Sequence, residues 1–229
     1  MDKKLLIFGA NGALGSGITK VLLQKYFEEI YLFATSFEKN TSDHRIKQIQ
    51  VKDLSQEKNV QMALANIETS EKNELFLVST IGGYYGGVKI WETEEVDFDR
   101  IFNTNLKSNF FICKNFISLL KRSYGGSIVL ISAYTANHPE KLKFIYGASK
   151  SALNYLVNVL AEEGKEINLS INAIAPMIID TDTNREWMKN QDTSGWIKPE
   201  EIGNLINSLF EHYNFISGNI IELKHRFSR

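Results

Sequence analysis

The chain has 229 residues, of which 43% are hydrophobic and 23% are charged, a composition typical of an ordinary globular protein. Its net charge of −1 gives no electrostatic attraction to nucleic acid or to an anionic membrane, so neither partner is predicted. A single cysteine, Cys113, excludes an internal disulfide, and the four histidines lack metal-ligand spacing, so no metal is predicted. No secretory signal or membrane-length apolar run is present, and we expect a cytoplasmic protein.

Short apolar runs typical of buried strands alternate along the chain with longer segments of helical periodicity. The predicted strands cover residues 4–8, 30–33, 46–51, 75–80, 127–133, 169–175 and 219–223. The predicted helices cover 13–27, 55–68 with Ser55 as cap, 94–122, 146–163 and 199–213, and some helix is expected within 181–196. This alternation predicts one doubly wound α/β domain, residues 1–229, in which helices flank both faces of a seven-stranded parallel sheet.

A glycine-rich turn, Gly9-Ala10-Asn11-Gly12-Ala13-Leu14-Gly15, follows the first predicted strand. Glycines at such a turn let the backbone approach a pyrophosphate, which rests on the free N–H groups of the next helix. The spacing is not the G-x-G-x-x-G of the standard fingerprint, and a glycine-rich turn without a ligand is the alternative. Its position after the first strand favours nucleotide binding, with these candidate residues: Gly9, Asn11, Gly12, Leu14 and Gly15.

The end of the second predicted strand bears on the choice between NAD and NADP. A carboxylate commonly binds the ribose 2′-hydroxyl of NAD there, whereas this chain has Thr35 and Ser36, with Lys39 shortly after. Small hydroxyls tolerate a 2′-phosphate better than an aspartate does, which slightly favours NADPH over NADH; simple turn residues are the alternative. Asp53 and Leu54, after the third strand, are placed near the adenine, although Asp53 could equally cap the following helix.

Tyr146 and Lys150 lie four residues apart in the segment 146–163, whose apolar spacing predicts a helix with a wide buried face. Residues four apart are neighbours on a helix, and a nearby ammonium favours the phenolate. We therefore expect Lys150 to lower the pKa of Tyr146 from its reference of about 10. Such a tyrosine can give a proton to a developing alkoxide and take it back. A surface tyrosine beside a solvated lysine is the alternative, because this spacing is common by chance.

Together, the glycine turn and the pair Tyr146 and Lys150 resemble the short-chain dehydrogenase/reductase family along essentially the whole chain. The resemblance implies a Rossmann-type fold, a nicotinamide cofactor and hydride transfer to or from a carbonyl, imine or activated double bond. It implies that Tyr146 is the acid/base, that Lys150 binds the nicotinamide ribose and that Asn105 supports a proton-relay water. For Asn105, a polar side chain that bonds backbone or faces solvent is the alternative.

The family normally places a serine thirteen residues before the tyrosine, where it hydrogen-bonds the substrate oxygen, and in this chain that count reaches Ala133. Ser132 is adjacent. Successive strand side chains point to opposite faces, so we expect Ser132 to point away unless a bulge re-aims it. Ala133 is thus the residue predicted to face the substrate.

A subgroup resemblance, to dihydropteridine reductases, rests on Gly12-Ala13-Leu14-Gly15, the loop 82–87, the segment 180–185 and the alanine at 133. It implies a quinonoid dihydropterin substrate, with Tyr84 packing on the pterin. Two features depart from the subgroup: no acidic residue ends the second strand, and Asn105 follows the broader family.

The resemblance also implies how the ligands lie. Gly82 leaves room beside the adenosine ribose, and Pro176 and Thr181 belong to a flexible lid, with Thr181 reaching the nicotinamide amide. Three functions stay open: a reductase of a small-molecule carbonyl or imine, a dihydropteridine-reductase-like enzyme, and a cofactor-binding sensor or scaffold without turnover.

The segment 94–122 carries more apolar residues than one sheet face needs, among them Phe110 and Phe111. In the family, this helix and the helix of 146–163 commonly form a four-helix interface between subunits. The resemblance therefore implies a homodimer, with a tetramer as the further alternative.

Overall fold

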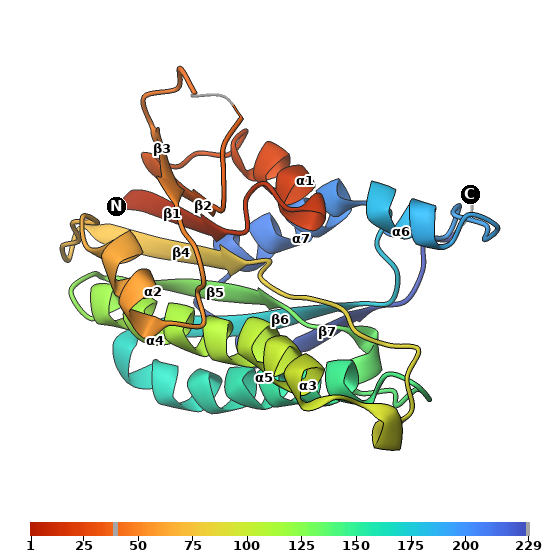
Figure 1. Cartoon of the computed structure of the whole chain (residues 1–229). Coiled ribbons are helices and arrows are strands. Elements are labelled where there is room, and N and C mark those ends of the chain that lie inside the picture. The colour runs from red at the N-terminus through yellow and green to blue at the C-terminus, as the bar shows by residue number, and fades with distance from the viewer. Residues whose placement is uncertain (39–40, 228–229) are drawn as a thin grey trace.

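The computed structural model describes residues 1–38 and 41–227, which form a seven-stranded sheet with helices on both faces (Figure 1). The strands are β1 Asp2–Phe8, β2 Glu29–Ala34, β3 Ile46–Gln50, β4 Asn73–Ser79, β5 Gly125–Ile131, β6 Leu169–Pro176 and β7 Ile220–Leu223. All neighbouring strands are parallel, in the order β3-β2-β1-β4-β5-β6-β7. The predicted fold class, a doubly wound Rossmann-type sheet, is confirmed.

Two groups of helices cover the sheet. One face is covered by α2 Glu57–Leu64, α4 Ser108–Leu120 and α5 Phe144–Glu163, and the other by α1 Ala13–Leu22 and α7 Pro199–Glu211 (Figure 1). The remaining helical segments are α3 Glu95–Phe102, α6 Asp182–Trp187, a π-helical turn Asn103–Lys107 and 3₁₀ turns Ile90–Glu92, Tyr134–Ala136 and Gly164–Ile167. Within the described part of the chain, no helix combines the length and apolar character that a membrane span needs.

The central strands are mostly apolar and buried because both of their faces are covered. Every residue of β5 and β6 is buried, and Phe8 on β1 stacks on Phe33 of β2 with ring centroids 4.1 Å apart. Cys113 lies within the core beneath α4, and burial raises the pKa of its thiol to about 12. Cys113 is therefore a small core residue.

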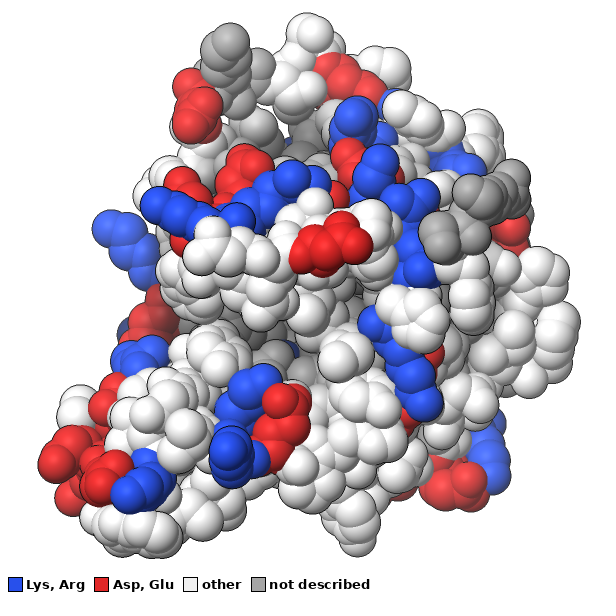
Figure 2. Space-filling view, turned by 90° about the vertical axis from the view of Figure 1, so that its right-hand side faces the viewer, with Lys and Arg blue, Asp and Glu red and all other residues white. Residues whose placement is uncertain are grey.

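The strand order reverses at β1, which pairs with β2 on one side and with β4 on the other. Connections therefore leave the carboxyl ends of β1 and β4 in opposite directions and open a crevice between them, the usual ligand position in such sheets. Figure 2 shows the molecule from this edge: the surface is hollowed across the middle, with charged side chains grouped around the hollow. The fold thus places the glycine turn and the ends of β4, β5 and β6 along one hollow.

Several predicted boundaries differ from the structure. The segment 94–122 is not one regular helix, because the π-helical turn separates α3 from α4. Helix α1 ends at Leu22 and α5 begins at Phe144, two residues before Tyr146. Ser55 does not cap α2, which begins at Glu57; its hydroxyl donates instead to Asp53 Oδ1 at 2.5 Å. That bond holds the turn after β3, where Asp53 adopts a positive φ of 42°.

Candidate active site

The glycine turn closes the end of β1 tightly. Gly9, at a φ of 81°, and Ala10 both donate their N–H groups to the Phe33 carbonyl of β2, at 2.9 and 3.1 Å. A Cβ on Gly15 would lie 1.9 Å from the Gly9 carbonyl oxygen, so only glycine allows this approach of α1 to the turn. Gly12 is the N-cap of α1 and no side chain caps the helix, which leaves first-turn N–H groups free for an anion.

A cavity of about 640 Å³ extends from this turn along the ends of β2 and β3. Its lining includes these predicted residues: Gly9, Asn11, Gly12, Thr35, Asp53, Leu54 and Gly82. Asn11 connects the glycine turn to the segment that follows β2, because its Nδ2 donates to the Ser36 carbonyl at 2.7 Å. Leu14 does not line the cavity and packs on the apolar core beneath α1. Lys39 lies outside the described residues.

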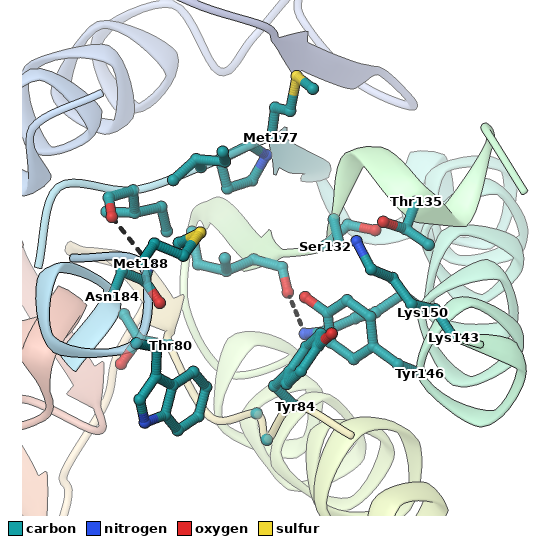
Figure 3. A pocket seen from close by; sticks show the side chains of 18 residues that line it. Thr80, Tyr84, Ser132, Thr135, Lys143, Tyr146, Lys150, Met177, Asn184 and Met188 are labelled. Atoms are coloured by element: carbon teal, nitrogen blue, oxygen red, sulfur yellow. Dashed lines mark hydrogen bonds between the residues drawn. The ribbon is translucent and has the colours of Figure 1, made fainter. Parts of the chain in front are cut away.

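A second cavity, of about 490 Å³, shares Thr80 and Gly82 with the first and continues along the ends of β5 and β6 (Figure 3). The predicted residues in its lining are Tyr84, Ala133, Tyr146, Lys150 and Pro176. The two cavities therefore adjoin at Thr80 and Gly82. Together they extend from the glycine turn to Tyr146, an arrangement that suits an extended dinucleotide and a small substrate.

Tyr146 lies in the first turn of α5 with its ring against Tyr84, at a centroid distance of 5.1 Å in an edge-on arrangement. Burial, together with the neighbouring Tyr84 and Glu140, raises the pKa of Tyr146 to about 12. The expectation that Lys150 lowers this pKa is therefore wrong for the structure described here. A phenol with this raised pKa is neutral at pH 7 and is able to donate a proton.

Lys150 is almost fully buried, with 4% of its surface exposed, and its Nζ donates to the Ile131 carbonyl at 2.7 Å. Burial lowers the pKa of its ammonium to about 8, because few polar groups replace the lost water. The helical spacing does bring Lys150 and Tyr146 to one cavity, but the ammonium is held by the end of β5 (Figure 3).

Asn105 is fully buried inside the π-helical turn and lies outside both cavity linings. Its Oδ1 accepts from the Gly83 N–H at 2.6 Å, and its Nδ2 donates to the Gly83 carbonyl at 3.0 Å and to Ser149 Oγ at 2.9 Å. The side chain therefore ties the loop after β4 to α5. The alternative considered from the sequence, a polar side chain that bonds backbone, describes these contacts.

Ala133 faces the cavity with an extended backbone, and its methyl group stands where the family usually has a hydroxyl. The hydroxyl of Ser132 donates to Asn154 Oδ1 on α5 at 2.5 Å and is buried there. Ser132 is also among the residues that line this cavity, but its hydroxyl is directed to Asn154.

Thr181 does not line the cavity in this structure. It is the N-cap of α6, where its Oγ1 accepts from the Asn184 N–H at 3.3 Å. Asn184, one turn later, lines the cavity instead, and its Nδ2 donates to the Ile179 carbonyl at 2.8 Å. A threonine that precedes a short helix is a typical cap, and this signal was available in the sequence.

Sequence analysis missed much of the substrate end of the cavity. Its further lining comes from these residues: Thr135, Lys143, Met177, Ile178, Ile179, Asn184, Trp187 and Met188. Lys143 could have been found, because it lies one helical turn before Tyr146 on the same face. Thr135 follows β5 and the others follow β6, where the sequence carries no comparable spacing. Trp196 is core and Trp91 is exposed, so only Trp187 of the three tryptophans lines the site.

A doubly wound sheet with a glycine turn at its switch point, and a tyrosine and lysine four residues apart at its carboxyl edge, is the arrangement of dinucleotide-dependent α/β oxidoreductases. The sequence model described as short chain dehydrogenase matches residues 3–192 of this chain. The chain belongs to the short-chain dehydrogenase family.

Individual proteins agree with this assignment. The chain is 28% identical to a dihydropteridine reductase of Dictyostelium discoideum over 214 residues, which cover 92% of this chain and 87% of that protein. It is 25% identical to carbonyl reductase family member 4 of Xenopus laevis over 232 residues, 96% of each chain. Among solved structures, ElxO with NADP bound superposes with a TM-score of 0.84 at 22% identity and 98% coverage of both chains, which is a likeness of fold.

The buried ammonium of Lys150 predicts a dependence of stability on pH. Its pKa is lowered from 10.5 to about 8 in the folded chain, so between these values the unfolded chain binds more protons. The free energy of unfolding of the wild type should therefore rise from pH 8 to 10.5 relative to Lys150→Met, by on the order of 3 kcal/mol. Urea unfolding across this range measures the difference. The exposed Lys141→Met should follow the wild type, and parallel curves for wild type and Lys150→Met would contradict the prediction.

Proposed function

We propose that this protein is an NAD(P)H-dependent reductase that transfers hydride to a carbonyl or imine carbon of a small molecule, with Tyr146 as the proton donor. The observation that carries the proposal is the position of the partly buried Tyr146 hydroxyl, whose raised pKa keeps it neutral at pH 7. It lines a cavity that shares Thr80 and Gly82 with the cavity at the glycine turn.

The residues present fit a nicotinamide dinucleotide. The uncapped start of α1 and the close approach at Gly15 suit a pyrophosphate. The cavity at Thr35 and Asp53 would take the adenosine, and Lys150 with Tyr146 would hold the nicotinamide ribose. The reduced cofactor, when bound, supplies the hydride.

In the proposed reaction, the residues of this chain move one proton. As negative charge develops on the substrate oxygen or nitrogen, the Tyr146 hydroxyl donates its proton to that atom and becomes a phenolate. Lys150 would stabilise the phenolate electrostatically, and a positive charge in a buried site has a large effect.

NADPH is the cofactor that we propose over NADH. The hydroxyls of Thr35 and Ser36 line the cavity at the end of β2, where a carboxylate would select NADH. Arg100 lines the same cavity and adds positive charge, although its guanidinium also binds Asp97 at 2.7 Å.

A second candidate is reduction of a quinonoid dihydropterin. The 28% identity to a dihydropteridine reductase favours it, as does the aromatic wall in which Tyr84 lies 6.0 Å from Trp187. Oxidation of NADPH and NADH with a panel of ketones, imines and quinonoid dihydropterin separates the two candidates. Nucleotide binding without turnover on any member would support the sensor instead.

Replacement of Tyr146 by Phe should lower kcat at least about hundredfold, because the proton donor is lost while the ring remains. Cofactor affinity, measured by fluorescence titration of NADPH, should change little. Stopped-flow or steady-state NADPH oxidation gives kcat. A Phe variant with normal turnover would show that another group supplies the proton.

Replacement of Thr35 by Asp should weaken NADPH binding at least about tenfold, through repulsion between the carboxylate and the 2′-phosphate. NADH binding should be equal or stronger. Thr35→Asn is the matched control, since it has the same shape without the charge. Calorimetric titration with both cofactors measures the ratio, and equal effects of Asp and Asn would place the 2′-phosphate elsewhere.

We further propose that two copies associate through the outer faces of α4 and α5. Phe110 of α4 and Tyr155 of α5 are 44% and 72% exposed, an unusual share for aromatic side chains on neighbouring helices. Val96 and Phe98 of α3 extend the same apolar surface, and both are exposed. A symmetric pairing of these helices would bury all four side chains.

Sedimentation at micromolar concentration should therefore show a dimer or a tetramer. Phe110→Asp should shift the population to monomer, because it places a charge within the proposed interface. Tyr26→Asp changes an exposed aromatic outside these helices and should leave the assembly intact. A monomeric wild type would refute the interface.

A further inference from the structure

The substrate end of the cavity contains a cation that the proposed chemistry does not use. Two lysines, Lys143 and Lys150, line this cavity, and no Asp or Glu is among its lining residues in the part of the chain that the structure describes. The ammonium of Lys150 already has a hydrogen-bond partner, because it is buried and donates to the Ile131 carbonyl. Lys143 has 30% of its side chain exposed and pairs with Glu140, which does not line the cavity.

The position of Lys143 is fixed by a small hydrogen-bonded group. Its Nζ donates to Glu140 Oε2 at 2.7 Å, and Thr135 Oγ1 donates to Glu140 Oε1, also at 2.7 Å. In Figure 3 the Lys143 side chain runs from α5 toward Thr135, so its ammonium lies on the wall of the cavity beyond Ser132. Glu140 therefore holds the ammonium and the threonine hydroxyl together at one side of the site.

The ion pair with Glu140 does not prevent the Lys143 ammonium from binding an anionic ligand. Glu140 is the more exposed partner, and such pairs three residues apart are weak in water. An anion inside the cavity meets the same ammonium in a less polar setting, where the attraction is stronger. The other polar side chains of the lining are hydroxyls and an amide, apart from Lys150, whose ammonium donates to the Ile131 carbonyl. Lys143 is therefore the cation of the lining that an acidic ligand would meet.

The shape of the cavity indicates the rest of the ligand. Tyr84 and Trp187 form an aromatic wall next to Tyr146, and Met177 and Met188 add flexible apolar side chains. Rings pack well on such walls, and methionines adapt to different outlines. The cavity is thus suited to a flat, largely apolar body.

We propose that the substrate of the reductase proposed above carries an anionic group, of which a carboxylate is the simplest, and that Lys143 with Thr135 binds it. The class is an aromatic or otherwise planar carbonyl or imine compound with an acidic substituent. Its reacting carbon lies at Tyr146 and its acidic group at Lys143. Glu140 is a positioning residue for this subsite.

The test uses matched acid and ester probes, 3- and 4-formylbenzoate and their methyl esters, with NADPH. The wild type should prefer at least one acid over its ester by tenfold or more in kcat/KM, with most of the difference in KM. Lys143→Gln should reduce this ratio to within about twofold. Lys141→Gln removes a charge from an exposed neighbour and should keep the ratio of the wild type. Glu140→Gln should lower KM for the acid, because a competing carboxylate is lost while the acceptor for Thr135 remains.

A binding measurement separates this inference from the reductase itself. Calorimetric titration of each acid and ester into the NADP-bound protein needs no turnover. If no probe is turned over, but the protein binds acids more tightly than esters and Lys143→Gln abolishes this difference, the reductase is refuted on these probes. The same result supports the subsite. Turnover of acid and ester at equal efficiency in the wild type, or an acid preference that survives in Lys143→Gln, would overturn the subsite and leave the reductase standing.

Discussion

The site depends on how one buried ammonium is held. Lys150 donates to the Ile131 carbonyl at the end of β5, and a Cβ on Gly82 would come within 2.9 Å of its Nζ. The end of β5, the loop after β4 and α5 therefore meet at this atom, and none of them can shift without exposing or crowding the charge. A buried charge with a single acceptor is costly, which agrees with the pKa of Lys150 being lowered to about 8. The unfavourable free energy of burying this ammonium therefore arises next to the position where negative charge on Tyr146 would develop.

The π-helical turn is the second constraint. An extra residue in the turn lets Asn105 reach Gly83 and Ser149, while its carbonyl accepts from Asn109 Nδ2 at 2.8 Å. Asn109 in turn accepts from Ser79 at the end of β4 at 2.6 Å. These bonds join β4, the loop that follows it, the turn and α5 into one buried polar network, in which each side chain has a partner. Such π-helical turns are common at functional sites, because they aim a side chain where a regular helix cannot.

Patterns of short range were enough to predict the sheet, the glycine turn and the spacing of Tyr146 and Lys150, because alternation and helical periodicity are local properties. The π-helical turn was not predictable, since 94–122 has a continuous apolar period and the extra residue is stabilised by Gly83, which is distant in sequence. The predicted direction of the pKa shift of Tyr146 was wrong, because spacing along a helix does not reveal that Lys150 Nζ donates to the Ile131 carbonyl. Lys143 was missed although its spacing was visible, because only the fold shows that its side of α5 borders a cavity.

The loss of a hydroxyl at Ala133 has a chemical consequence for the proposed reaction. With the Ser132 hydroxyl directed to Asn154, Tyr146 would be the side chain that meets the substrate acceptor atom from this wall in the proposed reaction. A ketone that becomes an alkoxide concentrates a full charge on one oxygen and gains from two donors. An imine or a quinonoid ring spreads its charge over several atoms and needs less stabilisation at any one of them. A neutral phenol of raised pKa acting alone is therefore better suited to the second kind of acceptor, and among the candidate substrates this argument favours a conjugated nitrogen compound over a simple ketone.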